Sequence, residues 1–406
     1  MNVLFLGRFY PCNILNSIVK DTRGKVGFSN HNFEQSLIKG FSCRNDVCLR
    51  VLSAPMVFSF PHNNKNAFIK KNNYLESDYT VRSIGFCNIA IVNIVSEIYA
   101  LTKAIRQEIS NFESDRVTII VNTPSLILST ALFKAIKKVK GKEIKTVLIV
   151  PDIPECMVEM NGTKSLKNKL VQWFNKRNAK LSLKYDKYVY LTEAMNDFYH
   201  ANSKDYIVME GLIDDSKANV NIKSNDFNKK EIILYTGTLS RIFGIMDLVN
   251  MFETAHFQNC ELCICGSGEC ASEIEELAKS NSNIKFYGLV DSNKATLLQS
   301  KATILANPRS ANGNYTKYSF PSKTIEYLMA GKTVIMNRLP GIPTEYDKYL
   351  HYPQNETSEA WKEKLMEIFK MDKAERKLRN DAGREFIIEK KLASIQCARI
   401  AELSMS

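Results

Sequence analysis

The chain has 406 residues, of which 45% are hydrophobic and 24% are charged. These values are typical of a soluble globular protein and are sufficient for two domains that each bury a core. The net charge of +12 lies in the first half: residues 1–200 hold 28 Lys and Arg against 16 Asp and Glu, whereas residues 201–406 hold 27 of each. This asymmetry predicts that the first half faces an anionic surface.

The N-terminal apolar run ends in Gly7-Arg8, which is typical of a first strand and not of a secretory signal. The most apolar long window, 84–101, contains Asn88 and Glu97 and predicts a buried helix, not a membrane span. The ten cysteines follow no disulfide framework, so we expect reduced thiols in a cytoplasmic protein. A metal site at the cysteines of 260–270 is not expected, because Cys263 and Cys265 alternate along a predicted strand.

Strand and helix signals alternate along the chain, which predicts a doubly wound α/β fold. In the first half the expected strands are 3–6, 47–52, 117–121, 146–150 and 188–191, and the expected helices are 33–41, 89–109, 126–139 and 166–183. After a polar segment that ends near residue 230, the expected strands are 232–235, 262–265, 284–287, 303–306 and 333–336, and the expected helices are 245–256, 271–280, 291–300, 321–330, 358–370 and 373–403.

This pattern predicts three segments: a Rossmann-like N-terminal domain at 1–205, a Rossmann-like C-terminal domain at 206–385, and a terminal helix at 386–406 that packs back on the N-terminal domain. Ligands of such sheets bind beyond the carboxyl ends of the strands, so two facing domains would hold them in the cleft between them.

Each of four successive strands in the second half ends in a loop suited to a ligand. The loops are Tyr235-Thr236-Gly237-Thr238, followed by Arg241 and Gly244; Cys265-Gly266-Ser267-Gly268-Glu269; Tyr287-Gly288-Leu289-Val290; and Asn307-Pro308-Arg309. Gly237 lets the backbone approach a ligand closely, and Arg241 is suited to bidentate contact with phosphate. Taken singly, the Gly-x-Gly element is also explained by a plain turn, and Arg309 by a surface cation. The four together favour a binding site.

A helix that starts at Phe320-Pro321-Ser322 directs its free amides and positive dipole end toward the preceding loop. Lys317 and Lys323 lie at the same end, where cations are unfavourable unless an anion neutralises them, although solvated charges are the alternative. Glu326 follows one turn later, near the edge of the buried side. An anion site beside a carboxylate suits a sugar nucleotide, with the diphosphate at the helix end and the ribose on Glu326.

The order of these motifs resembles the C-terminal domain of retaining nucleotide-sugar glycosyltransferases of family 4 and its relatives, specifically over residues 231–346 and loosely over the first half. The nearest resemblance is to bacterial enzymes that build capsular, O-antigen or exopolysaccharide chains. The resemblance implies the GT-B fold, in which two Rossmann-like domains face each other across a cleft. It also implies a nucleoside diphosphate-sugar donor, with neither a divalent metal nor another cofactor.

Carried over by motif, Arg241 and Lys323 would neutralise the diphosphate, and Glu326 would bind the ribose. Together with the strand-end loops, this gives the donor-binding positions Gly237, Thr238, Gly266, Gly268, Val290, Arg309, Lys317, Ser319, Phe320, Pro321, Ser322 and Glu326. One departure concerns the donor sugar. Many members carry two glutamates, of which the first lies eight positions before the ribose-binding one, and this chain has Tyr318 at that first position.

The first half supplies acceptor-side candidates. Family members place a Gly-rich loop close to the donor phosphate and the acceptor. Residues 24–28 lie at the corresponding place in this chain and include Gly27 and Phe28. The alternative is that 24–28 is a surface loop without a role in binding. The segment around Asp152, which lies between two prolines, resembles a family element. Asp152 is therefore the candidate to orient or deprotonate the acceptor hydroxyl. The alternative is that it serves only as a turn residue. Residues 122–125 look like a helix start with a capping role. His31 is the histidine nearest a predicted cleft loop.

Lysines and arginines cluster around 134–145 and, together with apolar residues, along 164–184. A basic amphipathic helix of this kind suits an anionic lipid surface, and a solvated helix is the alternative. No nucleic-acid motif accompanies the charge.

The sequence therefore predicts a cytoplasmic enzyme, peripheral on the inner face of the plasma membrane, that transfers a sugar from a nucleoside diphosphate to a lipid-linked saccharide with retention. The alternatives are a nucleotide-sugar epimerase of the same fold and a non-catalytic partner that binds sugar nucleotide or membrane.

Overall fold

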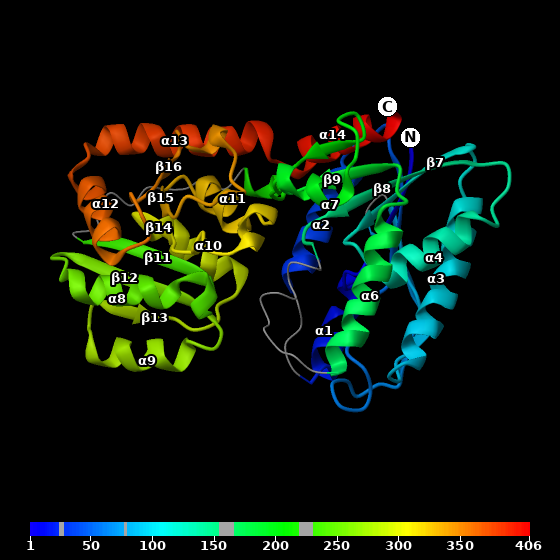
Figure 1. Ribbon diagram of the computed structural model, residues 1–406, viewed down its shortest axis with the longest axis horizontal. Coiled ribbons are helices and arrows are strands. Elements are labelled where there is room, and N and C mark those ends of the chain that lie inside the picture. Colours follow the sequence, from blue (N-terminus) through cyan, green and yellow to red (C-terminus); the bar gives the residue numbers. More distant parts are fainter. Residues whose placement is uncertain (24–27, 77–78, 154–165, 219–229) are drawn as a thin grey trace. The chain divides into compact units, whose positions relative to one another are not determined.

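The computed structural model describes residues 1–23, 28–76, 79–153, 166–218 and 230–406 (Figure 1). The chain forms two compact units. Unit 1 comprises Met1–Asp214 and Leu392–Ser406, and unit 2 comprises Asp215–Lys391. The divisions expected at 205/206 and 385/386 therefore lie at 214/215 and 391/392 in the structure.

Unit 1 is built on an eight-stranded sheet in the order β10-β9-β8-β7-β1-β2-β5-β4, in which β4 alone is antiparallel to its neighbour. The central strand, β1, carries Val3 to Leu6, all fully buried because helices cover both faces of a parallel sheet. The strands are β1 (Asn2–Gly7), β2 (Cys48–Ser53), β4 (Asn72–Glu76), β5 (Tyr79–Ser83), β7 (Arg116–Asn122), β8 (Glu143–Val150), β9 (Lys187–Tyr190) and β10 (Tyr206–Val208); β3 (Phe68–Ile69) and β6 (Phe86–Cys87) form a separate antiparallel pair.

The helices of unit 1 are α1 (Cys12–Asp21), α2 (Phe28–Ser42), α3 (Val92–Ser110), α4 (Leu126–Ile136), α6 (Leu166–Ser182), α7 (Asn196–Tyr199) and α14 (Ala393–Met405), with a 3-10 turn at Glu193–Met195. The C-terminal helix α14 packs on α2, where the Cys397 thiol lies 3.3 Å from the Leu37 carbonyl oxygen. The last residues of the chain therefore complete the first unit.

Unit 2 has a six-stranded parallel sheet in the order β13-β12-β11-β14-β15-β16. Numbered from its first strand, this is the 3-2-1-4-5-6 order of a dinucleotide-binding fold, so the chain reverses its direction across the sheet between β11 and β14. The strands are β11 (Glu231–Thr238), β12 (Cys260–Ser267), β13 (Ile284–Phe286), β14 (Ile304–Asn307), β15 (Thr333–Met336) and β16 (Leu350–His351).

The helices of unit 2 are α8 (Ile245–Ala255), α9 (Ala271–Ser280), α10 (Ser292–Lys301), α11 (Ser322–Met329), α12 (Ser358–Lys370) and α13 (Lys373–Lys390), with 3-10 turns at Asp215–Lys217, Arg241–Phe243, Asn314–Tyr318 and Thr344–Tyr346. One continuous core joins α8 and α12 to β11 and β12, with Val249, Ile264 and Leu365 fully buried. This core holds the strand ends in fixed positions.

The apolar window 84–101 differs from its prediction. It contains β6 and a turn before α3 begins at Val92, and α3 exposes Val92, Val95 and Tyr99 by 51%, 69% and 72%. The prediction of a buried helix is wrong for this side of α3, because overall hydropathy does not show which side of a helix meets the sheet. Within the described residues, no helix is both long and apolar enough to cross a bilayer.

Candidate functional site

In unit 2 the loops after β11 and β14 meet at the point where the strand order reverses. Gly244, which follows the 3-10 turn Arg241–Phe243, has φ 73°, and a Cβ at this position would lie 2.2 Å from the Pro308 carbonyl oxygen. Only glycine fits that backbone and that approach. In doubly wound sheets this crevice is where ligands bind.

The loop after β12 lies directly against the loop after β11. Gly266 has φ 150°, and a Cβ there would lie 1.8 Å from the Gly237 carbonyl oxygen. A Cβ on Gly268 would meet the Leu239 carbonyl oxygen at 2.2 Å. The Gly-x-Gly element thus has a packing role between two loops, whether or not it contacts a ligand.

Helix α11 is attached to the end of β11 through Tyr327. This buried hydroxyl accepts from the Thr236 amide at 2.9 Å and lies 3.2 Å from the Thr236 carbonyl oxygen. The contact brings the first turn of α11 beside the β11 loop. On that turn the Lys323 ammonium donates to the Glu326 carboxylate at 2.7 Å, and both side chains remain partly exposed.

Arg241 lies at the start of the 3-10 turn, where it binds two carboxylates, one in the loop after β12 and one on α9. Its guanidinium pairs with Glu273 of α9, and its amide donates to Glu269 at 3.0 Å. The hydrogen bond from the Arg241 amide is the main reason that the pKa of Glu269 lies below its ordinary value. The Arg241 and Glu273 side chains are 62% and 46% exposed, so the ion pair is open to water and to exchange.

Arg309, after β14, is half-buried. Its guanidinium carbon lies 5.5 Å from the ring centroids of both Phe243 and Tyr315, and the guanidinium donates to the Ser319 hydroxyl at 3.3 Å. The rings fix the plane of the cation and connect the β11 loop, the β14 loop and the segment before α11.

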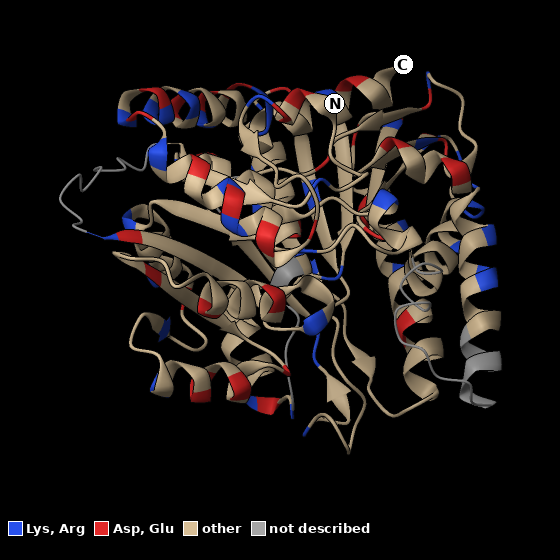
Figure 2. Cartoon of the chain, turned by 60° about the vertical axis from the view of Figure 1, so that its left-hand side comes forward, with Lys and Arg blue, Asp and Glu red and all other residues tan. Residues whose placement is uncertain are grey.

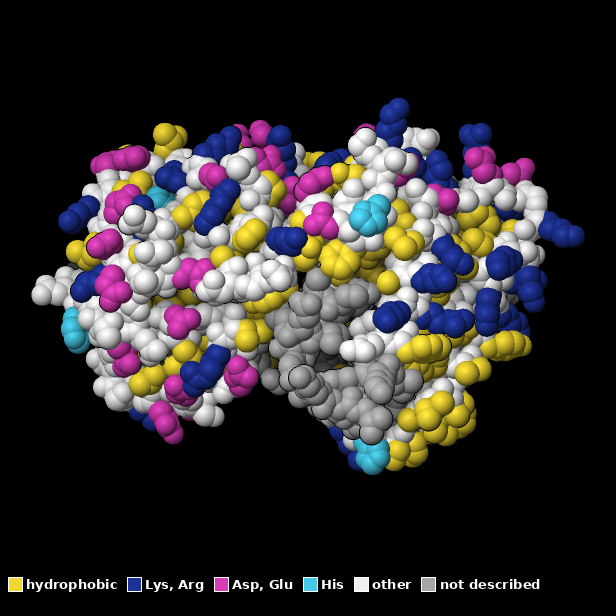
Figure 3. All heavy atoms as spheres, in the orientation of Figure 1, with side chains coloured by type: hydrophobic (Ala, Val, Ile, Leu, Met, Phe, Trp, Pro, Cys, Tyr) yellow, Lys and Arg dark blue, Asp and Glu magenta, His cyan; other side chains and the backbone are white. Residues whose placement is uncertain are grey.

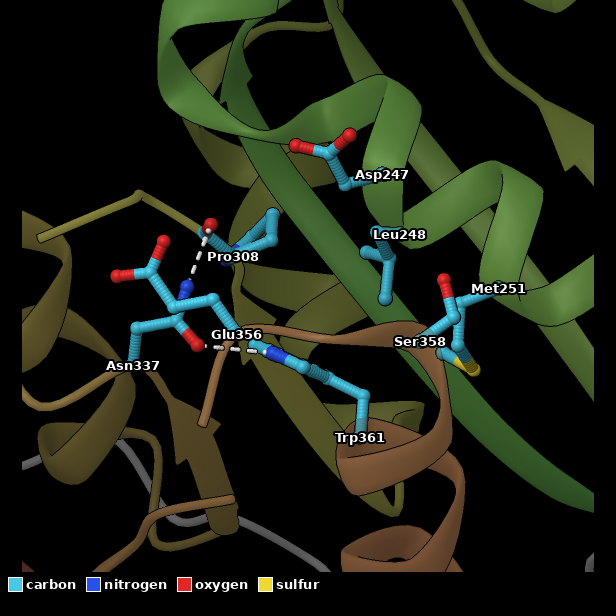
Figure 4. Close-up of a pocket in the computed structure, with 8 residues that line it drawn as sticks. All are labelled: Asp247, Leu248, Met251, Pro308, Asn337, Glu356, Ser358 and Trp361. Atoms are coloured by element: carbon cyan, nitrogen blue, oxygen red, sulfur yellow. Dashed lines mark hydrogen bonds between the residues drawn. The ribbon is translucent and has the colours of Figure 1, made fainter. Parts of the chain in front are cut away.

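Two polar side chains hold the backbone around Arg309. The Asn337 amide donates to the carbonyl oxygens of Pro308 and Arg309 and accepts from the Trp361 indole at 2.8 Å (Figure 4). Glu356 accepts from the Ala311 amide at 2.6 Å. These residues border a cavity of about 20 Å³, enough for roughly one water molecule and too small for a nucleotide.

The other donor-side positions differ in accessibility. Thr238 and Ser322 are exposed, whereas Val290, Lys317 and Ser319 are half-buried. Phe320 and Pro321 are buried, and the Phe320 ring packs 5.4 Å from that of Tyr346. The Lys317 ammonium lies 4.6 Å from the ring centroid of Tyr318, the residue that replaces the family's first glutamate.

The cysteines of β12 are buried in the sheet. Burial raises the pKa of the Cys260 thiol to about 12 and that of the Cys265 thiol to about 11. In the described ranges, no group of three or more His, Cys, Asp or Glu side chains is arranged to hold a metal ion.

In unit 1 the strand order reverses between β1 and β7, and a buried carboxylate occupies that position. Glu34 of α2 is fully buried and accepts from the Arg8 amide at 2.9 Å and the Asn122 side-chain amide at 2.8 Å. Asn30 donates to the same carboxylate at 3.3 Å. Burial raises the pKa of Glu34 to about 7, although the hydrogen bonds from Asn122 and the Arg8 amide and the Arg8 charge act to lower it.

Two further contacts fix the loop after β1. The Arg8 guanidinium pairs with Glu97 of α3 at 2.8 Å, and only 15% and 3% of these two side chains are exposed. The Tyr10 amide donates to His31 Nδ1 at 3.3 Å, and burial lowers the pKa of His31. His31 therefore lies among the buried groups at the ends of the strands.

The acceptor-side candidates are only partly described. Gly27 lies outside the described residues, and Phe28 is the first residue of α2. Asp152 is exposed and follows β8 directly. Ser125 caps α4 by accepting from the Leu128 amide, as expected of a helix start.

Several residues at these sites were not predicted from the sequence. The main ones are Glu34, Arg8 and Glu97 in unit 1 and Glu273 in unit 2. A signal for Glu34 exists, because it lies on the stripe of α2 that includes Leu37, Ile38 and Phe41, where a charge is unexpected. Exposed Glu273 has no such signal.

Comparisons with known proteins show the fold of the whole chain and a family resemblance over part of it. Residues 217–385 match the family model described as glycosyl transferases group 1. Three solved structures share the fold of the whole chain at 12–14% identity, with 98–99% of each chain covered. They are sucrose-phosphate synthase from Thermosynechococcus elongatus (12% identity, TM-score 0.65, 99% of this chain and 98% of that one), the lipopolysaccharide outer core galactosyltransferase WaaB in its apo form (13%, 0.60, 99% of both), and Anabaena HepE in complex with UDP (14%, 0.61, 99% of both). The sequence itself gave no significant match to curated proteins. Residues 217–385 therefore resemble glycosyl transferases group 1, and the chain as a whole has the GT-B fold.

Proposed function

We propose that the protein transfers a sugar from a nucleoside diphosphate-sugar to a lipid-linked saccharide, in the assembly of a cell-surface polysaccharide. The observation that carries this proposal is the contact of the loops after β11 and β14, which carry Arg241 and Arg309, with each other and of β11 with helix α11, at the point where the strand order of unit 2 reverses. Two structures of similar fold support the substrates: HepE is described in complex with UDP, and WaaB acts on a lipopolysaccharide core.

In this proposal Arg241 and Lys323 neutralise the diphosphate, together with the backbone at the start of α11. Glu326 accepts hydrogen bonds from the ribose. Both cations pair with carboxylates of the chain, so the diphosphate would replace Glu273 at Arg241 and join Glu326 at Lys323. Asp152 orients or deprotonates the acceptor hydroxyl.

Chemically, the acceptor oxygen bonds to the anomeric carbon while the bond from that carbon to the diphosphate oxygen breaks. The departing diphosphate gains negative charge, which the two cations stabilise in place without reorganisation. In a reaction on the front face of the sugar, the departing phosphate accepts the hydroxyl proton, and Asp152 then only orients that hydroxyl. We expect no requirement for a divalent metal, and activity should persist in excess EDTA.

The test uses the full-length protein with a panel of radiolabelled UDP-, GDP- and other sugar nucleotides and a lipid extract of bacterial membranes. We expect one donor to label a lipid-linked product and to release nucleotide only when acceptor is present. Isomerised donor without acceptor would identify an epimerase. Donor binding in a thermal-shift assay without turnover under any condition would identify a non-catalytic binding partner.

A further inference from the structure

Helices α3, α4 and α6 form one continuous outer layer of unit 1. Helix α3 packs against α4, and α4 packs against α6. Because α4 and α6 each connect two parallel strands, both run opposite to the strands of the sheet. Their second halves therefore lie toward the edge of the sheet where its strands begin.

The outward stripe of α3 changes character along its length. Residues at three- and four-residue spacing share one side of a helix, and on the exposed side Val92, Val95 and Tyr99 are followed by Lys103 and Arg106. Ile91, immediately before the helix, is 83% exposed. We name Ile91, Val92, Val95 and Tyr99 the α3 apolar patch. Scattered exposed apolar residues are ordinary, but a contiguous group of this kind marks an interaction surface.

Cations dominate the second halves of all three helices. The exposed basic residues are Lys103 and Arg106 on α3, Lys134 with the adjoining Lys137 and Lys138 on α4, and Lys176, Arg177 and Lys180 with the adjoining Lys184 on α6. Figure 3 shows hydrophobic side chains gathered at one end of this side of unit 1, with lysines and arginines beside them. Figure 2 shows basic but no acidic positions along the described part of α6.

No exposed carboxylate balances these cations on the described parts of the three helices. Their two acidic residues, Glu97 and Glu108, are 2% and 6% exposed. Glu97 pairs inward with Arg8, and Glu108 pairs with Arg50 and Arg82. The exposed charges on the described parts of the three helices are therefore all positive, which attracts an anionic partner.

An amphipathic aromatic side chain completes this surface. Trp173 of α6 is 51% exposed, and the Arg177 guanidinium lies 5.4 Å above its ring. Tryptophan and tyrosine favour the headgroup level of a bilayer, where an apolar ring meets a polar surface. Nucleic acid would account for the cations but not for exposed Ile91, Val92 and Val95, whereas an anionic bilayer accounts for both.

We propose that the outer layer of α3, α4 and α6 docks unit 1 on an anionic lipid bilayer, with the α3 apolar patch entering the headgroup region and the basic second halves facing lipid phosphates. This inference depends on the proposed lipid-linked acceptor only for its biological purpose, because lipid binding needs neither donor nor acceptor. The α3 apolar patch lies at the end of the layer nearest the carboxyl ends of the strands, where Arg8 pairs with Glu97.

The experiment is vesicle flotation of the full-length protein, with phosphatidylcholine alone and with about 30% phosphatidylglycerol. We expect binding only with the anionic lipid. The double variant Val92→Asp, Val95→Asp should reduce the partition coefficient about tenfold or more. The double variant Lys176→Glu, Lys180→Glu should reduce it about tenfold or more and remove most of its dependence on salt.

The matched controls lie in unit 2. Leu378 of α13 is 73% exposed and Lys279 of α9 is exposed, so Leu378→Asp and Lys279→Glu make the same changes elsewhere and should leave binding unaltered. Binding that survives Val92→Asp, Val95→Asp would overturn the role of α3, and absence of binding to any vesicle would overturn the docking surface altogether. Equal loss of RNA binding by the apolar double variant would also overturn the assignment to lipid. Thermal shifts with the sugar-nucleotide panel should be unchanged in all variants, which separates this outcome from a failure of the proposed function.

Discussion

The two units are both parallel α/β sheets, yet they use the reversal point of their strand order differently. In unit 1 that position is filled by buried groups with fixed partners: Glu34 bonds to Arg8 and Asn122, and Arg8 pairs with Glu97. In unit 2 the same position carries partly exposed cations that are held by partly exposed carboxylates. A buried ion pair keeps its partners because separation leaves an uncompensated charge, whereas an exposed pair exchanges them readily. The reversal point of unit 1 is therefore suited to hold the structure rigid, and that of unit 2 is suited to exchange its carboxylate partners for a ligand.

The largest effect should come from breaking the buried pair of unit 1. Glu97→Ala leaves the Arg8 guanidinium without its carboxylate at an almost buried position, so we expect a loss of about 3–5 kcal/mol in the free energy of unfolding. Urea unfolding followed by circular dichroism measures this loss. Glu143→Ala is the matched control, because it breaks the exposed pair with Arg116 on the same sheet and should cost less than about 1 kcal/mol. Equal losses in the two variants would contradict the distinction between buried and exposed pairs.

The next effect concerns catalysis in unit 2. Arg241→Ala and Lys323→Ala should each lower kcat by about 10²–10³, equivalent to roughly 2.7–4 kcal/mol, because each removes a charge that faces the departing diphosphate. The free energy of unfolding should change little, since both side chains are partly exposed. Initial rates of sugar transfer are the measurement, with Lys279→Ala on α9 as the control. If a variant lost activity only in proportion to its loss of stability, its cation would stabilise the fold and would not act on the departing diphosphate.

The buried carboxylate of unit 1 should also make stability depend on pH. The pKa of Glu34 rises from its ordinary 4.5 to about 7 on folding, so between these values the folded chain keeps a proton that the unfolded chain releases. Stability from this group is therefore complete below about pH 4.5 and falls as the pH rises through about 7, by about 3 kcal/mol. Glu34→Gln should remove this slope, and exposed Glu143→Gln should not. Denaturation midpoints of the variants and wild type across pH 4.5–7.5 test this, and parallel profiles for wild type and Glu34→Gln would show that Glu34 does not titrate in this range.

The sequence predicted the elements well where periodicity and turn residues agree. The strand expected at 333–336 and the helices expected at 271–280 and 358–370 have those bounds in the structure. The helix expected at 373–403 is two helices, α13 and α14, which end and begin around Lys391 and Leu392. The same strong local signals placed four loops and a helix start at one edge of the unit 2 sheet, and the contacts of Gly244, Gly266 and Tyr327 bring them together there.

What the sequence could not predict depends on contacts between distant segments. Arg241 could be assigned to phosphate from its motif, but its partner Glu273 lies 32 residues away on another helix. The same is true of Arg8 and Glu97, which are joined only when α3 packs beside the loop after β1. The exposed stripe of α3 was read as buried because the direction of an apolar side chain depends on which neighbours cover it. Motifs thus predict which residues lie at the strand ends, and packing decides which of their charges are fixed.

The smallest effect tests exchange at Arg241 directly. If Glu273 occupies the guanidinium until a diphosphate replaces it, Glu273→Gln should raise the affinity for the nucleoside diphosphate of the preferred donor, by up to about fivefold, since an exposed pair contributes about 1 kcal/mol or less. Isothermal titration calorimetry measures this change, and the gain should shrink at high salt because exposed charges are screened. Glu275→Gln on the same helix is the control for net charge, because Glu275 points away from the Glu273 side. A lower affinity in Glu273→Gln would mean that Glu273 orients Arg241 for the diphosphate and does not compete with it, and the reversal point of unit 2 would then share the fixed character of unit 1.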